Sequence, residues 1–269
     1  MKQPLIAFGL FWLLACALGW GAFALRPHTG AELDGLAALL ANPMMLIAKF
    51  SPSIAGLALL AVGGRGVRTR FLDAAARPRI MPIVLALVVP GVLTAGALAT
   101  ANALRALDAG ALLAGFNIAS LAYWIGLRTL LGGGLGEEPG LRGVALPLLL
   151  ERMGPRRAAL LMGVCWGIWH LPALWGRPPE LWAGQFALTI SGSLIMTFVW
   201  VRFGPSLWAA MLFHGSLNGW SAFTSNHWAH HLGAVDGWQV IRLLALLLLA
   251  LTLLPLSWRR QHPTHGVPS

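Results

Sequence analysis

Long apolar stretches separated by short polar segments dominate the hydropathy pattern of this chain. A helix that crosses a membrane needs about 20 mostly apolar residues. Seven stretches approach or reach this length, and an eighth does so if residues 44–64 are taken together. The eight stretches are residues 3–25, 44–64, 80–104, 111–127, 158–175, 181–201, 203–226 and 239–258. The pattern predicts an all-α, polytopic integral membrane helical bundle with about eight transmembrane helices, or seven without the second stretch.

The composition supports a membrane protein. Hydrophobic residues make up 57% of the chain and charged residues only 10%, with a mean hydropathy of +0.72. A soluble domain carries roughly a quarter charged residues, so an ordinary soluble enzyme, a disordered chain and a disulfide scaffold are excluded. The first apolar stretch is longer than the apolar region of a signal peptide, which spans about 7–15 residues, so we expect it to be retained as a span.

Basic residues outnumber acidic residues, with 19 Lys+Arg against 9 Asp+Glu. They lie between the apolar stretches, which is typical of the flanks of membrane spans rather than of a nucleic-acid-binding face. With eight spans, most of them fall on one side of the membrane, Arg128 and Arg142 among them, whereas Lys49 falls on the other. This positive-inside asymmetry predicts that both termini are cytoplasmic.

An acidic pair, Glu137 and Glu138, follows a glycine-rich segment at a depth where ionisable groups are costly and usually functional. Proline is well tolerated in a first helical turn, so Pro139 predicts a helix that begins at about Glu137 or Glu138. Glu138 and Arg142 are four residues apart, in the order that favours a helical ion pair. Either both glutamates cap the helix and neutralise Arg142, or Arg142 holds Glu138 while Glu137 stays available as a general base.

Two further pairs of polar residues lie in apolar stretches. Trp166 with His170, and His214 with Asn218, are each four residues apart, so the members of each pair share a helix face. Taken alone, His170 could be explained as a residue that caps the helix end before Pro172. His214 and Asn218, taken alone, could be explained by hydrogen bonds between helices. Together with the acidic pair, these residues place a potential site on three helical segments.

In the order of these motifs, the chain resembles the CPBP family of intramembrane endopeptidases. This family includes type 2 CAAX prenyl proteases and bacteriocin-processing, lysostaphin-resistance-like proteins. The resemblance rests on Glu-Glu-x-x-x-Arg from Glu137 to Arg142, aromatic-x-x-x-His from Trp166 to His170, and His-x-x-x-Asn from His214 to Asn218. The chain departs from the family at Pro139 and Gly140, where bulky apolar residues are common. This departure would alter the helix start and the direction of the Glu137 side chain.

The resemblance implies an intramembrane peptidase mechanism. Glu137 and His170 would activate a water for attack on a peptide carbonyl, and His214 with Asn218 would stabilise the oxyanion. The residues that support this site would be Glu138, Arg142 and Trp166. This interpretation requires no cofactor, and the pairing of His214 with Asn218 favours it over a metal site. The alternative is a zinc ion held by Glu137, His170 and His214, with water in the fourth position.

A second histidine group follows the third motif, at His227, His230 and His231. Solvated histidines in an interfacial loop are the favoured interpretation, and a metal site is the alternative. The expected organisation is residues 1–131 for N-terminal spans without a signature, 132–226 for the core with the motifs, and 227–269 for a last span with a disordered tail.

Two other classes of protein stay open. One is a non-catalytic scaffold or immunity protein of the same fold, and the other is a proton-coupled transporter that uses buried Glu and His as a relay. A transporter would show paired halves with helices broken in matching places, and the sequence has no such symmetry. The expected partners are membrane lipid and a peptide or protein substrate in or at the membrane, for example a prenylated CAAX-type protein. Nucleic acid is not an expected partner.

Overall fold

The computed structural model describes residues 4–26, 42–105, 116–227, 236–256 and 258. This part of the chain is helical and contains no strand, which confirms the all-α prediction. The helices are α1 (Pro4–Ala24), α3 (Pro43–Val62), α4 (Arg65–Ala76), α5 (Ile80–Arg105), α7 (Ile118–Leu130), α8 (Gly134–Gly140), the π-helix η1 (Leu141–Ala145), α9 (Leu146–Leu150), α10 (Pro155–Trp169), α11 (Leu171–Leu174), α12 (Pro179–Phe203), α13 (Leu207–His227) and α15 (Asp236–Leu253).

Five helical stretches of the described residues are long and apolar enough to cross a membrane. They are α1, α3, α5, α12 and the bent stretch that runs from α7 to α9. The chain is therefore a multi-pass helical membrane protein. The other three expected spans correspond to α10, α13 and α15. Helix α10 has only 15 residues, the apolar part of α15 is short, and polar side chains such as His214 and Asn218 lower the hydropathy of α13.

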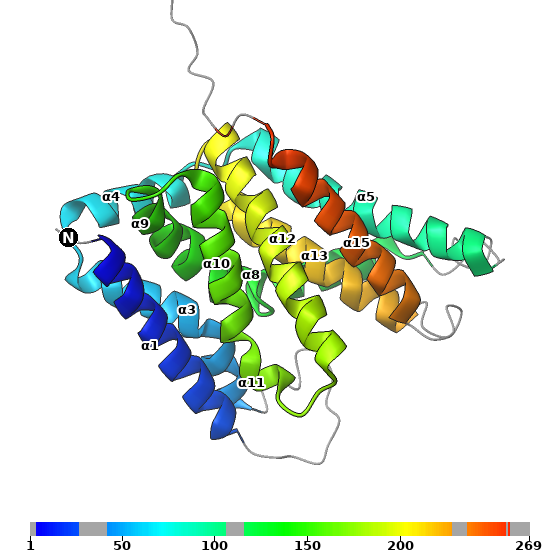
Figure 1. Ribbon diagram of the computed structural model, residues 1–269, viewed down its shortest axis with the longest axis horizontal. Coiled ribbons are helices and arrows are strands. Elements are labelled where there is room, and N and C mark those ends of the chain that lie inside the picture. The colour runs from blue at the N-terminus through cyan, green and yellow to red at the C-terminus, as the bar shows by residue number, and fades with distance from the viewer. Residues whose placement is uncertain (1–3, 27–41, 106–115, 228–235, 257, 259–269) are drawn as a thin grey trace, which may run out of the picture.

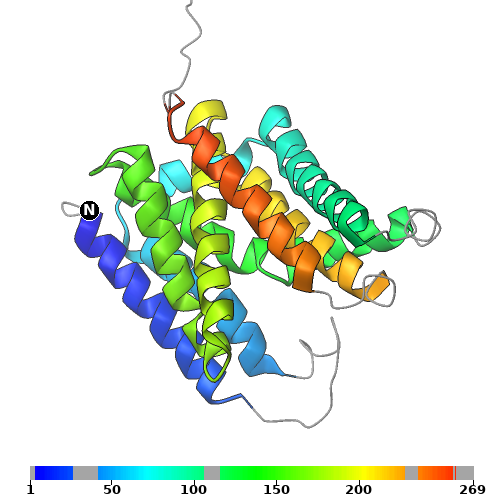
Figure 2. The ribbon, with the colours of Figure 1, turned by 45° about the vertical axis from the view of Figure 1, so that its right-hand side comes forward.

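Helix α12 lies in the middle of the bundle (Figures 1 and 2), with α1, α3 and α10 on one side and α5, α13 and α15 on the other. Helix α1 packs along α3, α10 along α12, and α13 along α5 and α7. The largest buried cluster joins the first group and includes Phe11, Val144 and Met162. Helix α8, which carries the acidic pair, contacts α3 from one group and α13 from the other.

Glycines four residues apart bring helices close together at two crossings. Gly163 and Gly167 of α10 face α12, where a Cβ at Gly163 would lie 2.6 Å from Ile190 Cα. Gly215 and Gly219 of α13 face α7 in the same way. Small residues at such interfaces let helices associate in lipid, where burial of apolar surface gives no driving force. The same stretches carry the tryptophan and histidine motifs, so these side chains lie beside close helix crossings.

Helices α3 and α8 also cross closely, and each contains a proline. Pro52 lacks the N–H that would bond to the Ala48 carbonyl, and the Ser51 hydroxyl donates to that oxygen instead, at 2.9 Å. Gly140 of α8 lies against the Pro52 carbonyl, where a Cβ would collide with the oxygen. The close approach of α3 therefore requires the glycine at position 140.

Candidate active site

The glycine-rich segment ends in the turn that starts α8. Gly133 is the residue that precedes the helix, and its φ of 125° lies in the region that favours glycine. The ring of His214 lies against this residue, so a Cβ at Gly133 would be 2.5 Å from Nε2. Helix α8 begins at Gly134, and the expected start at Glu137 or Glu138 is wrong.

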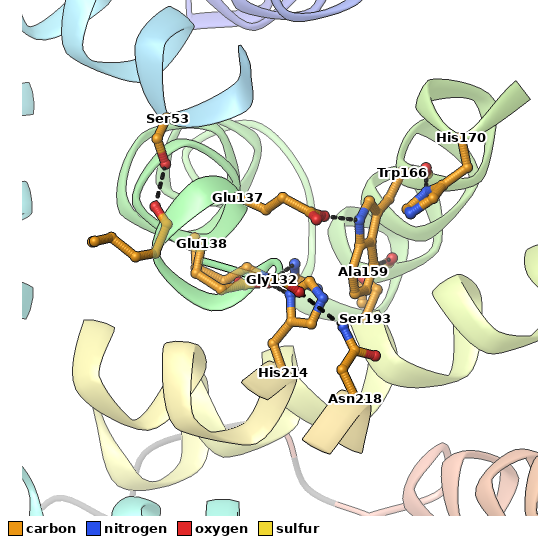
Figure 3. A network of polar contacts seen from close by, with 12 residues as sticks. Ser53, Gly132, Glu137, Glu138, Ala159, Trp166, His170, Ser193, His214 and Asn218 are labelled. Carbon is orange, nitrogen blue, oxygen red and sulfur yellow. Dashed lines mark hydrogen bonds and ion pairs between the residues drawn. The ribbon is translucent and has the colours of Figure 1, made fainter. Parts of the chain in front are cut away.

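Pro139 lies inside α8 instead of in its first turn. Its missing N–H leaves the Leu135 carbonyl without its helical donor, and the Ser53 hydroxyl of α3 donates to that oxygen at 2.8 Å (Figure 3). The chain then widens into the π-helix η1, a feature often found at functional sites. A side chain from a distant helix thus lets the helix begin before the proline.

Glu138 is the centre of a buried polar cluster. Its Oε1 accepts hydrogen bonds from Arg142 Nη1 at 3.0 Å and from His214 Nδ1 at 2.8 Å. The ion pair expected from the spacing is present, and both of its members are 0% exposed. Arg142 is therefore not a loop cation, and its place in the count of flanking charges was wrong.

Glu137 points toward α10 (Figure 3), where Trp166 Nε1 donates to its Oε2 at 2.7 Å. Its side chain is buried, as is the indole. The Arg142 guanidinium lies 4.6 Å from the centroid of the Trp166 ring, and the His214 ring packs edge-on against that indole at 5.1 Å. The two adjacent glutamates therefore have different partners: a cation and an imidazole for Glu138, and a neutral indole for Glu137.

His170 follows the last residue of α10. Its Nδ1 lies 2.8 Å from the Trp166 carbonyl, and because a carbonyl only accepts, Nδ1 carries the proton. The ring packs edge-on against Trp169 at 4.7 Å. The helix-capping contact considered from the sequence is therefore present, and it leaves Nε2 of the neutral ring with a lone pair.

Asn218 lies one helical turn after His214 on α13. Its Nδ2 donates to the Gly132 carbonyl at 3.3 Å (Figure 3). This bond joins α13 to the glycine-rich segment before α8. Together with the contact between His214 and Glu138, it fixes α13 against the segment that carries the acidic pair.

Side chains from all three motifs line one cavity of about 300 Å³. Glu137, His170, His214 and Asn218 face it from α8, the end of α10 and α13. Helices α3 and α7 add Lys49 and Arg128, and α12 adds Gln185 and Thr189. The count of flanking charges assigned Lys49 and Arg128 to opposite sides of the membrane, and the structure instead brings both to this cavity. Their position inside apolar helices is the signal that identifies them.

The zinc alternative requires Glu137, His170 and His214 to converge on one point. Within the described ranges, no three His, Cys, Asp or Glu side chains are arranged to hold a metal ion. These residues do not fit a zinc site in this arrangement. The histidines at positions 230 and 231, the side chain of the one at 227, and the tail from 261 to 269 lie outside the described residues.

A comparison with protein families matches residues 119–220 to the family described as Rce1-like: Type II CAAX prenyl endopeptidase Rce1-like. The match begins in α7, ends in α13 and includes all of the candidate residues of the three motifs. A comparison with curated proteins finds no match. The family resemblance seen in the motifs is confirmed by this match to the Rce1-like type II CAAX prenyl endopeptidases, which covers residues 119–220 of this membrane protein.

Proposed function

We propose that this protein is an intramembrane endopeptidase that hydrolyses a peptide bond of a membrane-associated protein, with prenylated CAAX-type substrates as the first to test. The family of residues 119–220 supports a protease. The observation that carries the assignment is the shared cavity, which Glu137, His170, His214 and Asn218 line from three helical segments.

Glu137 acts as the general base in this proposal. It accepts a proton from a water molecule as the water oxygen attacks the carbonyl carbon of the substrate, and it returns the proton to the nitrogen that leaves when the C–N bond breaks. The indole of Trp166 orients the carboxylate through the 2.7 Å hydrogen bond. His170 assists through Nε2, because the Trp166 carbonyl holds the proton on Nδ1.

His214 and Asn218 stabilise the oxyanion of the tetrahedral intermediate. Glu138 orients the His214 ring through Nδ1, so Nε2 is the nitrogen that can face the substrate. When both ring nitrogens are protonated, Nε2–H donates to the oxyanion, and the adjacent Glu138 carboxylate stabilises the positive charge on the ring. The Asn218 amide supplies a second donor from the same face of α13.

The test compares membranes that contain equal amounts of wild type, Glu137→Gln or Glu180→Gln, together with a coexpressed prenylated CAAX-type protein. Glu180 is an exposed residue that does not line the cavity, so its variant controls for the substitution itself. Mass spectrometry of peptide termini should find cleaved ends with wild type and Glu180→Gln that are missing with Glu137→Gln. Identical termini in all three membranes, with all three proteins inserted, would contradict the proposal and favour a non-catalytic scaffold.

A further inference from the structure

Two cations outside the three motifs line the same cavity as Glu137. Lys49 lies within α3 and Arg128 lies in the last turn of α7, and both belong to stretches that are apolar enough to cross a membrane. Ionisable groups at this depth are costly, and they usually pair or face a cavity in which they function. Such residues need an explanation when the fold provides no partner.

Neither cation forms an ion pair with any described acidic residue. Arg128 Nε is buried and has no hydrogen-bond partner among the residues that the structure describes, and the guanidinium lies 5.6 Å from the centroid of the Trp124 ring. Lys49 is half-buried beside the cavity. Arg142, by contrast, is paired with Glu138. The two unpaired cations therefore differ from the cation that holds the site together.

The charges of the cavity wall do not balance. Among the described residues that line it, Glu137 is the only acidic side chain, whereas Lys49 and Arg128 are both cationic. With neutral histidines, two positive charges oppose one negative charge. One cation would be enough to neutralise Glu137, and neither of the two contacts it as an ion pair. A single anionic group from a ligand would balance the wall.

Both cations lie next to the segment that carries the proposed base. The Arg128 side chain runs over Gly132, so a Cβ there would be 2.6 Å from Arg128 Cδ. The backbone carbonyl of Lys49 lies against Gly136, directly before Glu137. The Gly132 carbonyl also accepts the Asn218 amide. Because Lys49 and Arg128 also line the cavity, a substrate placed for attack at Glu137 lies in the same cavity as both cations.

We propose that Lys49 and Arg128 form a carboxylate subsite that binds an anionic group of the substrate next to the scissile bond. This inference rests on the proposed function and names a feature of its substrate. The remaining wall is largely apolar, with Trp20, Phe23 and Met45 among its residues. The substrate is thus an apolar peptide segment with one carboxylate, supplied by the free C-terminus or by an acidic side chain.

The test uses purified protein and three dye-labelled peptides of the same apolar sequence with a prenylated cysteine. One ends in a free carboxylate, one in an amide, and one in an amide with a glutamate near the expected cleavage site. Wild type should cleave the free carboxylate or the glutamate peptide about 10- to 100-fold more efficiently than the plain amide, as expected for charge-assisted hydrogen bonds. The preferred peptide identifies the source of the carboxylate.

The variants assign this preference to the two cations. Lys49→Met with Arg128→Gln should raise KM for the preferred peptide and leave the plain amide almost unchanged. Lys49→Arg with Arg128→Lys should restore most of the preference, and exposed Arg157→Gln should retain all of it. An equal loss on all peptides, or a preference that survives in the double variant, would overturn the subsite.

A binding measurement separates this inference from the proposed function. Fluorescence anisotropy of the same peptides with the Glu137→Gln protein reports affinity without cleavage. If wild type cleaves no peptide, the proposed function fails, and tighter binding of a carboxylate peptide that is lost in the Lys49 and Arg128 variant still supports the subsite. Equal affinity for carboxylate and amide peptides would overturn it.

Discussion

Helices α8, α10 and α13 supply hydrogen-bonded polar side chains to the cavity, whereas α3 and α7 supply cations without ion-pair partners among the described residues. In the first region, Glu137, Glu138 and His214 are all held by neighbouring side chains within 3.0 Å. In the second, Lys49 and Arg128 face the same space with no acidic partner in the part of the chain that the structure describes. The first region holds its polar side chains in fixed positions, which suits catalysis. The second region presents unpaired charges, which suits the binding of a charged ligand.

The two regions also support one another. Ser53 of α3 donates to the Leu135 carbonyl of α8, and Trp169 at the end of α10 donates to Ser51 of α3 at 3.0 Å. Gly140 brings the α8 backbone against α3. The position of the proposed base therefore depends on a helix outside the family match, and substitutions in α3 should affect the site.

The largest expected effect on stability is that of Glu138→Gln. The change leaves the fully buried Arg142 charge without its partner, which costs about 3–5 kcal/mol. Denaturant unfolding of the purified protein measures this loss. The double variant Glu138→Gln with Arg142→Met removes the orphaned charge and should be more stable than Glu138→Gln alone. A double variant that is less stable would contradict the ion pair as the cause.

Asn218→Ala should have the next largest effect, chiefly on activity, although it also removes the hydrogen bond to the Gly132 carbonyl. Loss of one oxyanion donor typically lowers kcat by about 10²–10³-fold. Exposed Asn226 on the same helix bonds to its own backbone at Ala222, so Asn226→Ala is the matched control and should keep nearly full activity. Peptide cleavage rates at saturating substrate measure both. Equal rates for the two variants would remove Asn218 from the mechanism.

Gly140→Ala tests the contact between the two regions. A Cβ collides with the Pro52 carbonyl, so α3 must move away from α8 at a cost of about 1–3 kcal/mol. Gly21→Ala in α1, where a Cβ meets open space, is the control and should not be destabilising. Thermal unfolding midpoints compare the variants. An unchanged midpoint for Gly140→Ala would show that the two helices do not approach so closely.

Ser53→Ala should give the smallest effect. It removes the donor to the Leu135 carbonyl that Pro139 leaves free, and costs about 1 kcal/mol. Exposed Thr252, whose hydroxyl bonds to Leu249 within its own helix, provides a control in Thr252→Ala. If Ser53→Ala is no more harmful than this control, another donor satisfies Leu135.

Contacts within one helix could be predicted from the sequence. The spacing of Glu138 and Arg142 predicted their ion pair, and the spacing of Trp166 and His170 predicted their common face, because helical geometry alone fixes both. The length of the apolar stretches predicted the all-α membrane fold. The side chains that line the cavity from the three motifs were also on the list of candidates.

Contacts between helices could not be predicted in this way. The spacing of the motifs did not indicate that the indole of Trp166 bonds to Glu137. It also did not indicate that His214, which was paired with Asn218 on its own helix, bonds to Glu138 on another helix. The expected helix start failed because Ser53, far away in the sequence, compensates for Pro139. Arg142 and Lys49 were counted as flanking charges because composition does not reveal which cations the tertiary structure buries.

The most direct test of the separate roles of the two glutamates measures cleavage rate and stability in parallel for Glu137→Gln and Glu138→Gln, two identical changes at adjacent positions. We expect Glu137→Gln to lower kcat on the order of 10³-fold and to change the free energy of unfolding by less than about 1 kcal/mol, whereas Glu138→Gln should be strongly destabilised. Full activity in Glu137→Gln would contradict the role of Glu137 as the general base.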